Sequence, residues 1–303
     1  MASFERFGRG WPATQVRFTR ERINVMRLCW WIAILSLTLL RATALEQTVA
    51  QRPDATPADP AARRAVRQAL MNELKTVTLA NCSFQRFGSR NDGGYVMCAN
   101  LIDGAQSGYS YGIGGNDDWG CQISSAHKIP VHQYDCFNPP KETCASGRFV
   151  PHAECVGGRP ETIESRVFDT VSSQIARNGD QGKRLIVKMD VEGAEWDALM
   201  ATPDAVLERF DQLPMELHGV DESRFVKVVQ KLKRTFHLVH LHFNNWACSP
   251  DLAPFPANAY QVLFVNKRLG VVGTPPDGTP PARAFDAPDN PRGKDCQLPA
   301  SRE

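Results

Sequence analysis

The fold of this chain is decided by a stretch of twelve residues, LIVKMDVEGAEW, at positions 185–196. Its first five residues are a mainly apolar run of strand length, and a glycine follows shortly after. Beyond the glycine, Glu195, Trp196, Leu199 and Met200 recur at helical spacing. A strand that turns directly into a helix is the repeating unit of parallel α/β sheets. We therefore predict an α/β fold.

Two acidic residues, Asp190 and Glu192, follow this predicted strand at its carboxyl end. Ligand sites of open α/β sheets lie just beyond such ends. Because side chains alternate along a strand, we expect Lys188, Asp190 and Glu192 on one face and Val187 and Met189 in the core on the other. The simpler interpretation is that the acids only cap the following helix. Their position after an apolar strand favours a functional role, since perturbed carboxylates gather in sites.

The composition fits one large domain and argues against nucleic-acid binding. The chain has 303 residues, of which 42% are hydrophobic, enough for a sizeable core. Its net charge of +2 is uneven, because residues 1–44 hold seven Arg and two Glu. The remainder keeps 28 basic and 31 acidic residues, a net charge of −3. Such a domain lacks a basic footprint, so we expect no nucleic-acid partner.

The chain has nine cysteines, one of which, Cys29, lies in an apolar leader. The other eight are Cys82, Cys98, Cys121, Cys136, Cys144, Cys155, Cys248 and Cys296. An even number fits up to four disulfides in an oxidising compartment. Buried reduced thiols are the alternative for Cys98, Cys121 and Cys155, which lie in apolar runs. A zinc ribbon is excluded because no Cys-x-x-Cys pair occurs.

The N-terminal region predicts entry into the secretory pathway. Residues 1–27 are basic, and residues 28–45 form an apolar leader. The apolar core of this leader, residues 28–40, is shorter than the ~20 residues that span a bilayer. An Ala-x-Ala site follows it, and both features favour a cleaved signal peptide and a secreted protein. A signal anchor over residues 25–45 fits nearly as well. It would attach the protein to the membrane as a type II protein with its domain in the ER or Golgi lumen.

The rest of the chain divides into a stalk, a domain and a tail. Residues 46–61 are rich in Pro and Ala, and we predict a stalk. The domain, residues 62–268, opens with an amphipathic helix at 62–79. Strands then alternate with helices until a last pair without a helix between them, which predicts a mostly parallel sheet with one antiparallel strand. Residues 269–303 are rich in Pro and Gly, and we predict disorder.

A glycine-rich turn at Gly112, Gly114 and Asn116 is a candidate cofactor site. Glycine lets the backbone approach a ligand closely, although a plain tight turn is the simpler interpretation. Asp135 ends the next predicted strand about twenty residues on, where a carboxylate can bind both ribose hydroxyls. Glu154, near the end of the strand after that, is placed to border an adenine. A third glycine at the usual interval is missing, which counts against a nicotinamide dinucleotide.

Several of these motifs resemble one known family. Residues 187–196 resemble the signature strand of FkbM-type S-adenosylmethionine-dependent methyltransferases. Residues 92–95 (DGGY), 216–218 (ELH) and the pattern His-x-Asn-Asn at 242–245 are similar to a eukaryotic methyltransferase-like branch of that group. The similarity covers roughly residues 80–268.

The resemblance implies a Rossmann-like class I methyltransferase with a seven-stranded, mostly parallel sheet and one antiparallel strand. It implies S-adenosylmethionine on the glycine turn and Asp135, with substrate near Asp190 and Glu192. Together with the residue patterns, the expected cofactor-binding residues are Gly112, Gly114, Asn116, Asp135, Glu154 and Asp190. Substrates differ widely on one fold, so the fold alone does not supply the acceptor.

Methyl transfer to a hydroxyl benefits from a general base, and Asp190, Glu192 and His218 are the candidates. Only His218 has an ordinary pKa that suits neutral pH; the alternative is a histidine hydrogen-bonded at a strand end. A metal-assisted reaction would use Asp190, Glu216, His218 and His242, a mixed ligand set that suits manganese, iron or zinc, but no pair has a diagnostic spacing.

We expect oxygen methylation of a small-molecule or glycan-like acceptor, because nothing basic or extended marks a nucleic-acid groove. The alternative from another functional class is a lumenal binding or scaffold module that has kept the fold and lost catalysis. The sequence gives no indication of an oligomeric state.

Overall fold

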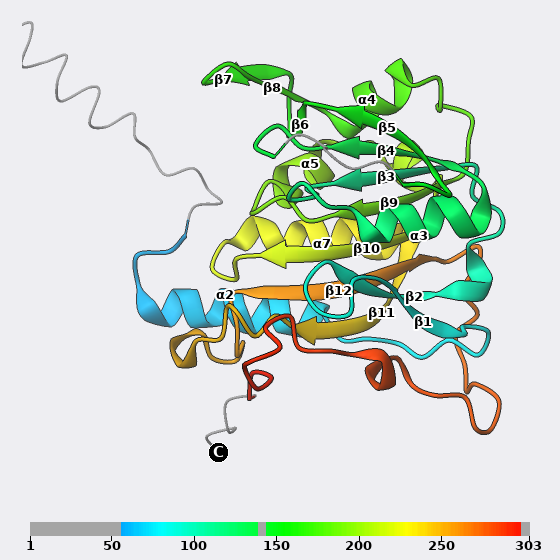
Figure 1. Ribbon diagram of the computed structural model, residues 1–303. Coiled ribbons are helices and arrows are strands. Elements are labelled where there is room, and N and C mark those ends of the chain that lie inside the picture. The colour runs from blue at the N-terminus through cyan, green and yellow to red at the C-terminus, as the bar shows by residue number, and fades with distance from the viewer. Residues whose placement is uncertain (1–55, 139–143, 298–303) are drawn as a thin grey trace, which may run out of the picture. The chain divides into compact units, whose positions relative to one another are not determined.

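The computed structural model describes residues 56–138 and 144–297 (Figure 1). The basic segment, the leader at 28–45 and most of the stalk therefore lie outside the described residues. Of the helices that the structure does describe, none is long and apolar enough to cross a membrane.

A seven-stranded sheet forms the centre of the domain. In spatial order its strands are β11 (Phe236–Phe243), β12 (Ala259–Asn266), β10 (Phe210–His218), β9 (Leu185–Met189), β3 (Ser107–Tyr111), β4 (Pro130–Tyr134) and β5 (Arg148–His152). Strands β10, β9, β3, β4 and β5 pair in parallel, and β12 is antiparallel to both of its neighbours. This mixed α/β architecture is consistent with a Rossmann-like fold and confirms the predicted mostly parallel sheet with one reversed strand.

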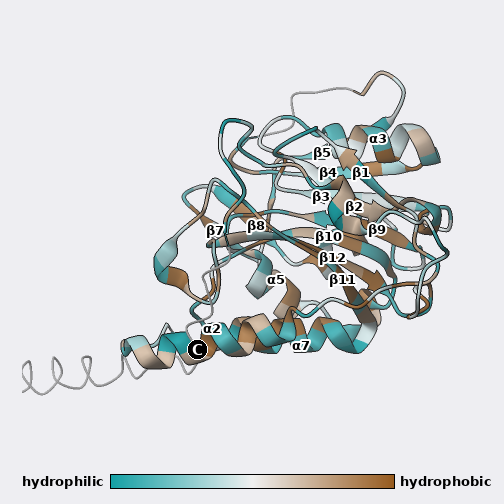
Figure 2. Ribbon diagram, turned by 90° about the horizontal axis from the view of Figure 1, so that it is seen from below, coloured by the Kyte–Doolittle hydropathy of each residue, from teal (hydrophilic) through white to brown (hydrophobic). Residues whose placement is uncertain are grey.

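Helices cover the sheet on both faces, and each face has its own hydrophobic cluster. One cluster packs against α2 (Pro60–Glu73), α4 (Val171–Arg177), α5 (Glu195–Ala201), α6 (Asp204–Leu207) and α7 (Ser223–Thr235). The other packs against α3 (Asp118–His127) and the hairpin of β1 (Phe84–Gly88) and β2 (Gly94–Cys98). Figure 2 shows α7 with hydrophobic and hydrophilic residues alternating along its length, as its amphipathic sequence requires.

Smaller elements complete the described chain. A three-stranded sheet joins β6 (Cys155–Val156), β8 (Arg166–Asp169) and β7 (Glu161–Ile163). Three short 3₁₀ helices are η1 (Ala99–Leu101), η2 (Pro250–Leu252) and η3 (Ala282–Phe285).

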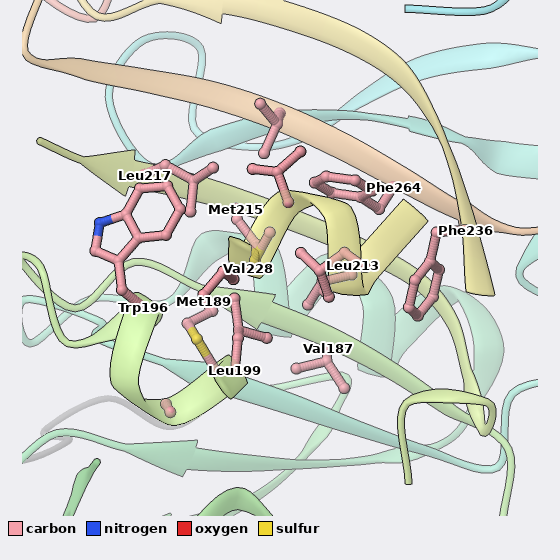
Figure 3. Close-up of a cluster of buried hydrophobic side chains, with 14 of the residues drawn as sticks. Val187, Met189, Trp196, Leu199, Leu213, Met215, Leu217, Val228, Phe236 and Phe264 are labelled. Atoms are coloured by element: carbon pink, nitrogen blue, oxygen red, sulfur yellow. The ribbon is translucent and has the colours of Figure 1, made fainter. Parts of the chain in front are cut away.

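The decisive stretch folds as predicted, with alternate side chains of β9 on opposite faces. Val187 and Met189 are fully buried beside Leu213 and Met215 of β10, under helices α5 and α7 (Figure 3). Full burial of such a side chain stabilises the fold by about 1.5–3 kcal/mol. Trp196 closes this core, since its ring stacks on Phe225 at 4.2 Å between centroids. Strand β9 is thereby held in a fixed position in the middle of the sheet.

Two predicted helices have different bounds in the structure. Helix α2 begins at Pro60, inside the predicted stalk, and ends at Glu73 rather than at residue 79. Proline is suited to the first turn of a helix, and Asp59 caps it by accepting from the backbone N–H groups of Ala61 and Ala62. The helix after β9, predicted from Glu195 to Phe210 with an interruption at Pro203, forms two helices, α5 and α6, on either side of that proline.

All eight cysteines of the domain form disulfides. The pairs are Cys82–Cys98, Cys121–Cys144, Cys136–Cys155 and Cys248–Cys296. The predicted even pairing is confirmed, and the alternative of buried thiols is wrong. Four disulfides indicate an oxidising environment, either secretory or extracellular.

The C-terminal segment, residues 269–297, differs from its predicted disorder. It is tied to the domain by the disulfide Cys248–Cys296 and by side-chain hydrogen bonds. Asn245 Oδ1 accepts from the backbone of Asn290 at 2.7 Å, and Gln261 donates to Asp289 at 2.8 Å. The high content of Pro and Gly prevents long helices and strands here, but these individual bonds and the covalent link fix the segment without them.

Candidate functional site

A cavity of about 620 Å³ lies at the carboxyl ends of the central strands. Strands β4 and β5, which follow β3 in the chain, lie on one side of it in the sheet, and β9, which comes next in this sheet, lies on its other side. The order of the strands therefore changes direction beside β3. Open α/β sheets bind ligands at such a switch point. The cavity is lined by the turn after β3, by residues following β4 and β9, and by residues of the β1–β2 turn and the small sheet.

The glycine turn after β3 forms one wall of the cavity. Gly112, Gly114 and Gly115 all have positive φ angles, of 71°, 58° and 90°. A Cβ atom on Gly112 would lie 1.6 Å from the carbonyl oxygen of Asp190, whereas one on Gly114 or Gly115 would meet nothing within 4 Å. Gly112 therefore allows the chain segments after β3 and β9 to touch, and the next two glycines expose bare backbone. Asn116 also lines the cavity, as predicted.

Asp135 organises this turn from the end of β4. Its Oδ2 accepts from the N–H groups of Ile113 at 3.2 Å and Gly114 at 3.0 Å. Its Oδ1 accepts from those of Phe137 at 2.9 Å and Asn138 at 2.6 Å. A carboxylate has about four acceptor positions, and these bonds occupy them. Asp135 lines the cavity as predicted, but its carboxylate holds two loops and reaches a ribose only by exchanging these partners.

Glu154 is not among the residues that line the cavity. Its carboxylate pairs with Arg177 of α4 instead. The lining beside β4 is mainly apolar and includes Phe137, Val156, Phe168 and the cysteines of the Cys136–Cys155 disulfide. Flat apolar ligand groups therefore fit this end of the cavity, which Glu154 does not line.

Asp190 lines the opposite side of the cavity. Tyr95 donates its hydroxyl to Asp190 Oδ2 at 2.6 Å, and the Lys188 ammonium lies 3.7 Å from the same oxygen. Lys188 also donates to the carbonyl groups of Tyr111 and Gly112. Burial, followed by the charge of Asp190, holds the pKa of Tyr95 well above its ordinary value, so this phenol stays a hydrogen-bond donor. Asp190 is thereby oriented by a hydrogen bond from Tyr95 of β2 and by an ion pair with Lys188 of β9.

His218 lies outside the main cavity and beside a second hollow of about 340 Å³. Its Nδ1 is 3.0 Å from Glu195, and its Nε2 is 3.5 Å from Glu216 and 3.4 Å from Glu192. Burial lowers the pKa of His218, but the hydrogen bonds and charges of Glu195 and Glu216 outweigh it and raise this pKa to about 11. This raised pKa favours the protonated imidazolium, which has no free electron pair with which to act as the predicted general base.

Glu195 is a site residue that the sequence interpretation missed. It is fully buried, and its two oxygens accept from the backbone N–H groups of Val191 at 2.7 Å and Gly193 at 2.9 Å. It thus closes the turn between β9 and α5. The signal was its place in the first turn of the predicted helix, where acids bind free N–H groups. The side chain of Glu192, between these residues, is 87% exposed and reaches both hollows.

The predicted metal ligands are only partly brought together. Asp190, Glu192 and His218 offer ligand atoms within 4.8 Å of one another, and Glu216 is next to them. His242 is separated from this group, because β12 lies between its strand, β11, and β10. Its Nε2 faces Asp295 at 3.7 Å.

Comparison with known proteins adds no family assignment: no family model matches this chain, and no curated protein sequence matches it.

Proposed function

We propose that this protein is an S-adenosylmethionine-dependent methyltransferase of the secretory pathway that methylates an oxygen of a small-molecule or glycan-like acceptor. The seven-stranded sheet with its reversed strand β12 has the arrangement expected of a class I methyltransferase. The site at the switch point beside β3 is where that fold binds its cofactor.

The charge of the cavity lining is the observation that carries this proposal. Among the described residues that line the cavity, one is basic, Lys188, and six are acidic: Asp92, Asp117, Asp118, Asp135, Asp190 and Glu192. An acidic lining repels the phosphates of a dinucleotide and attracts a cation such as the sulfonium of S-adenosylmethionine. The volume of about 620 Å³ lies within the range of about 300–1,000 Å³ typical of small-ligand pockets.

The two ends of the cavity suit the two ends of this cofactor. The apolar end, with Phe137, Val156 and Phe168, fits an adenine ring. The acidic end, with Asp92 and Asp190, fits the sulfonium and amino groups. The open backbone at Gly114, in the turn after β3, belongs to the lining and gives the ribose and methionine parts room to approach.

In the proposed reaction, an acceptor oxygen attacks the methyl carbon and the carbon–sulfur bond breaks. The bonding electrons stay on sulfur, and S-adenosylhomocysteine leaves. Positioning and exclusion of water supply most of the acceleration. A carboxylate that takes the hydroxyl proton adds about 10²–10⁴-fold, and Asp190 and Glu192 are the proposed candidates. His218 instead holds Glu195 and Glu216 in place as a cation.

A methyl-transfer assay tests the proposal with full-length protein from a secretory host. Labelled S-adenosylmethionine is offered with a panel of oligosaccharides and small alcohols. We expect label in an acceptor, at least 10²-fold less with Asp190→Asn, and unchanged transfer with Asp103→Asn. Asp103 is the matched control, since its side chain is 85% exposed and it is not part of the lining. Cofactor binding without transfer to any acceptor would favour the inactive binding module.

A further inference from the structure

Three carboxylates from distant parts of the chain meet beside the cavity. Asp92 lies in the β1–β2 turn, Glu216 near the end of β10, and Asp289 in the C-terminal segment. Ligand oxygens of the three lie within 4.8 Å of one another. Glu216 and Asp289 are 4% and 1% exposed, and Asp92 lines the cavity. The sequence analysis included Glu216 among possible metal ligands but not the other two.

The two buried carboxylates each have one oxygen without a hydrogen-bond partner. Glu216 Oε1 accepts from Asn244 at 2.7 Å, and Asp289 Oδ1 accepts from Gln261 at 2.8 Å. The second oxygens, Oε2 of Glu216 and Oδ2 of Asp289, have no partner within the described part of the chain. A buried charged oxygen without a donor or a cation is strongly unfavourable. These two oxygens are therefore available to a ligand of opposite charge.

The basic side chains nearby form no hydrogen bond with these two oxygens, although Nη1 of Arg86 is itself buried without a hydrogen-bond partner among the described residues. Arg86 donates to the carbonyl groups of Ser89 at 3.2 Å and Asn91 at 2.5 Å. No ion pair joins it to the three carboxylates among residues 56–138 and 144–297. Lys188 donates to backbone carbonyls after β3. His218 approaches Glu216 through Oε1, the oxygen that already has a donor. Protein cations therefore leave Oε2 and Oδ2 unsatisfied.

We propose that Asp92, Glu216 and Asp289 bind a hard divalent cation, with Ca²⁺ as the best fit. All three ligands are carboxylates, which suit Ca²⁺, Mg²⁺ and Mn²⁺ rather than zinc. Ligands on opposite sides of Ca²⁺, at about 2.3–2.6 Å each, are about 4.6–5.2 Å apart, so oxygens within 4.8 Å of one another lie within the span of one coordination sphere. Ca²⁺ also tolerates the irregular geometry of ligands from three separate segments, whereas Mg²⁺ requires a near-ideal octahedron.

The site would connect the C-terminal segment to the wall of the cavity. The ion would join Asp289 to the β1–β2 turn through Asp92 and to the central sheet through Glu216. Asp92 gives it access to water from the cavity for the remaining coordination positions. Asp92 belongs to both proposed sites, whereas Glu216 and Asp289 are not in the cavity lining, so Ca²⁺ binding measured without S-adenosylmethionine in variants of these two residues tests the ion site separately.

Calorimetry and thermal unfolding of the disulfide-bonded full-length protein test this site. The protein is stripped with a chelator and titrated with CaCl₂, and separately with MgCl₂, MnCl₂ and ZnCl₂. We expect one Ca²⁺ per chain and a higher Tm with Ca²⁺. Glu216→Gln and Asp289→Asn should each weaken Ca²⁺ binding at least tenfold. In the absence of the ion, Asp289→Asn should melt no lower than the wild type, since it removes a buried charge that has no ion-pair partner among the described residues.

Two further variants keep the test decisive. Asp92→Asn changes a residue in an exposed turn, so it should fold normally and still weaken Ca²⁺ binding at least tenfold. Asp295→Asn is the matched control, since this acid lies in the same segment as Asp289 but outside the group, and its binding should be unchanged. Saturable Ca²⁺ binding that survives the Asp92 and Asp289 changes would overturn the proposal. Absence of Ca²⁺ binding, or tighter binding of zinc, would also overturn it.

Discussion

Replacing Glu195 by glutamine should strongly destabilise the domain, although it changes the size of the side chain very little. Glu195 is 0% exposed and accepts from two backbone N–H groups while facing the positively charged His218 at 3.0 Å. Glutamine would keep one oxygen as an acceptor, but its NH₂ group would face one of the N–H groups that now donate to Glu195, and two donors cannot form a hydrogen bond with each other. Breaking a buried ion pair from one side costs about 3–5 kcal/mol. We expect about 3 kcal/mol, because Glu216 still faces His218.

Urea unfolding with intact disulfides measures this loss by linear extrapolation. Glu192→Gln is the matched control, because Glu192 also faces His218, at 3.4 Å, but its side chain is 87% exposed. Exposed ion pairs contribute about 0–1 kcal/mol, so this variant should unfold almost like the wild type. A loss below about 1 kcal/mol for Glu195→Gln, or equal losses for both variants, would refute the assigned role of the buried pair.

Two further predictions concern the glycine turn and a histidine pair. Gly112→Ala should lower the free energy of unfolding in urea by more than about 3 kcal/mol, because its Cβ would overlap the Asp190 carbonyl. Gly115→Ala should lower it by about 1–2 kcal/mol, because only the positive φ angle of this residue opposes the change. Burial lowers the pKa of His132 to about 4 and also lowers that of His152. Below pH 6.5 these two histidines take up protons in the unfolded chain before they do so in the folded protein. The free energy of unfolding should therefore fall by about 1–2 kcal/mol between pH 7 and pH 5, a figure that allows for solvent screening. The fall should be smaller in His132→Phe, which lacks one of the two groups.

Local patterns in the sequence were sufficient to predict the sheet and the position of the cavity. The strand at 185–189, its following helix and the glycine turn each combine a periodic apolar pattern with a turn residue, and such signals act within about twenty residues. The carboxyl ends of parallel strands then meet at one edge by geometry. Asp190, Gly112 and Gly114 were placed in the lining for this reason.

The charge state and the partners of the site residues could not be predicted in the same way. The pKa of His218 is raised because Glu195 and Glu216, from two chain segments, both lie against its ring, and no local pattern records that arrangement. Asp92 and Asp289 are 197 residues apart and meet only after the C-terminal segment packs on the sheet. The composition of that segment suggested disorder, since its stabilising disulfide and hydrogen bonds are made to residues far away in the sequence.

Calorimetric titration of the full-length protein with S-adenosylmethionine, and in parallel with NAD⁺, tests the central claim most directly. We predict saturable binding of one S-adenosylmethionine per chain, displaced by S-adenosylhomocysteine, and no saturable binding of NAD⁺. Phe137→Ala should weaken S-adenosylmethionine binding about fivefold, the equivalent of about 1 kcal/mol of ring contact, without destabilising the domain, because Phe137 is 63% exposed. Binding of NAD⁺ in preference to S-adenosylmethionine, or no binding of S-adenosylmethionine to the folded protein, would contradict the assignment of this acidic cavity to a sulfonium cofactor.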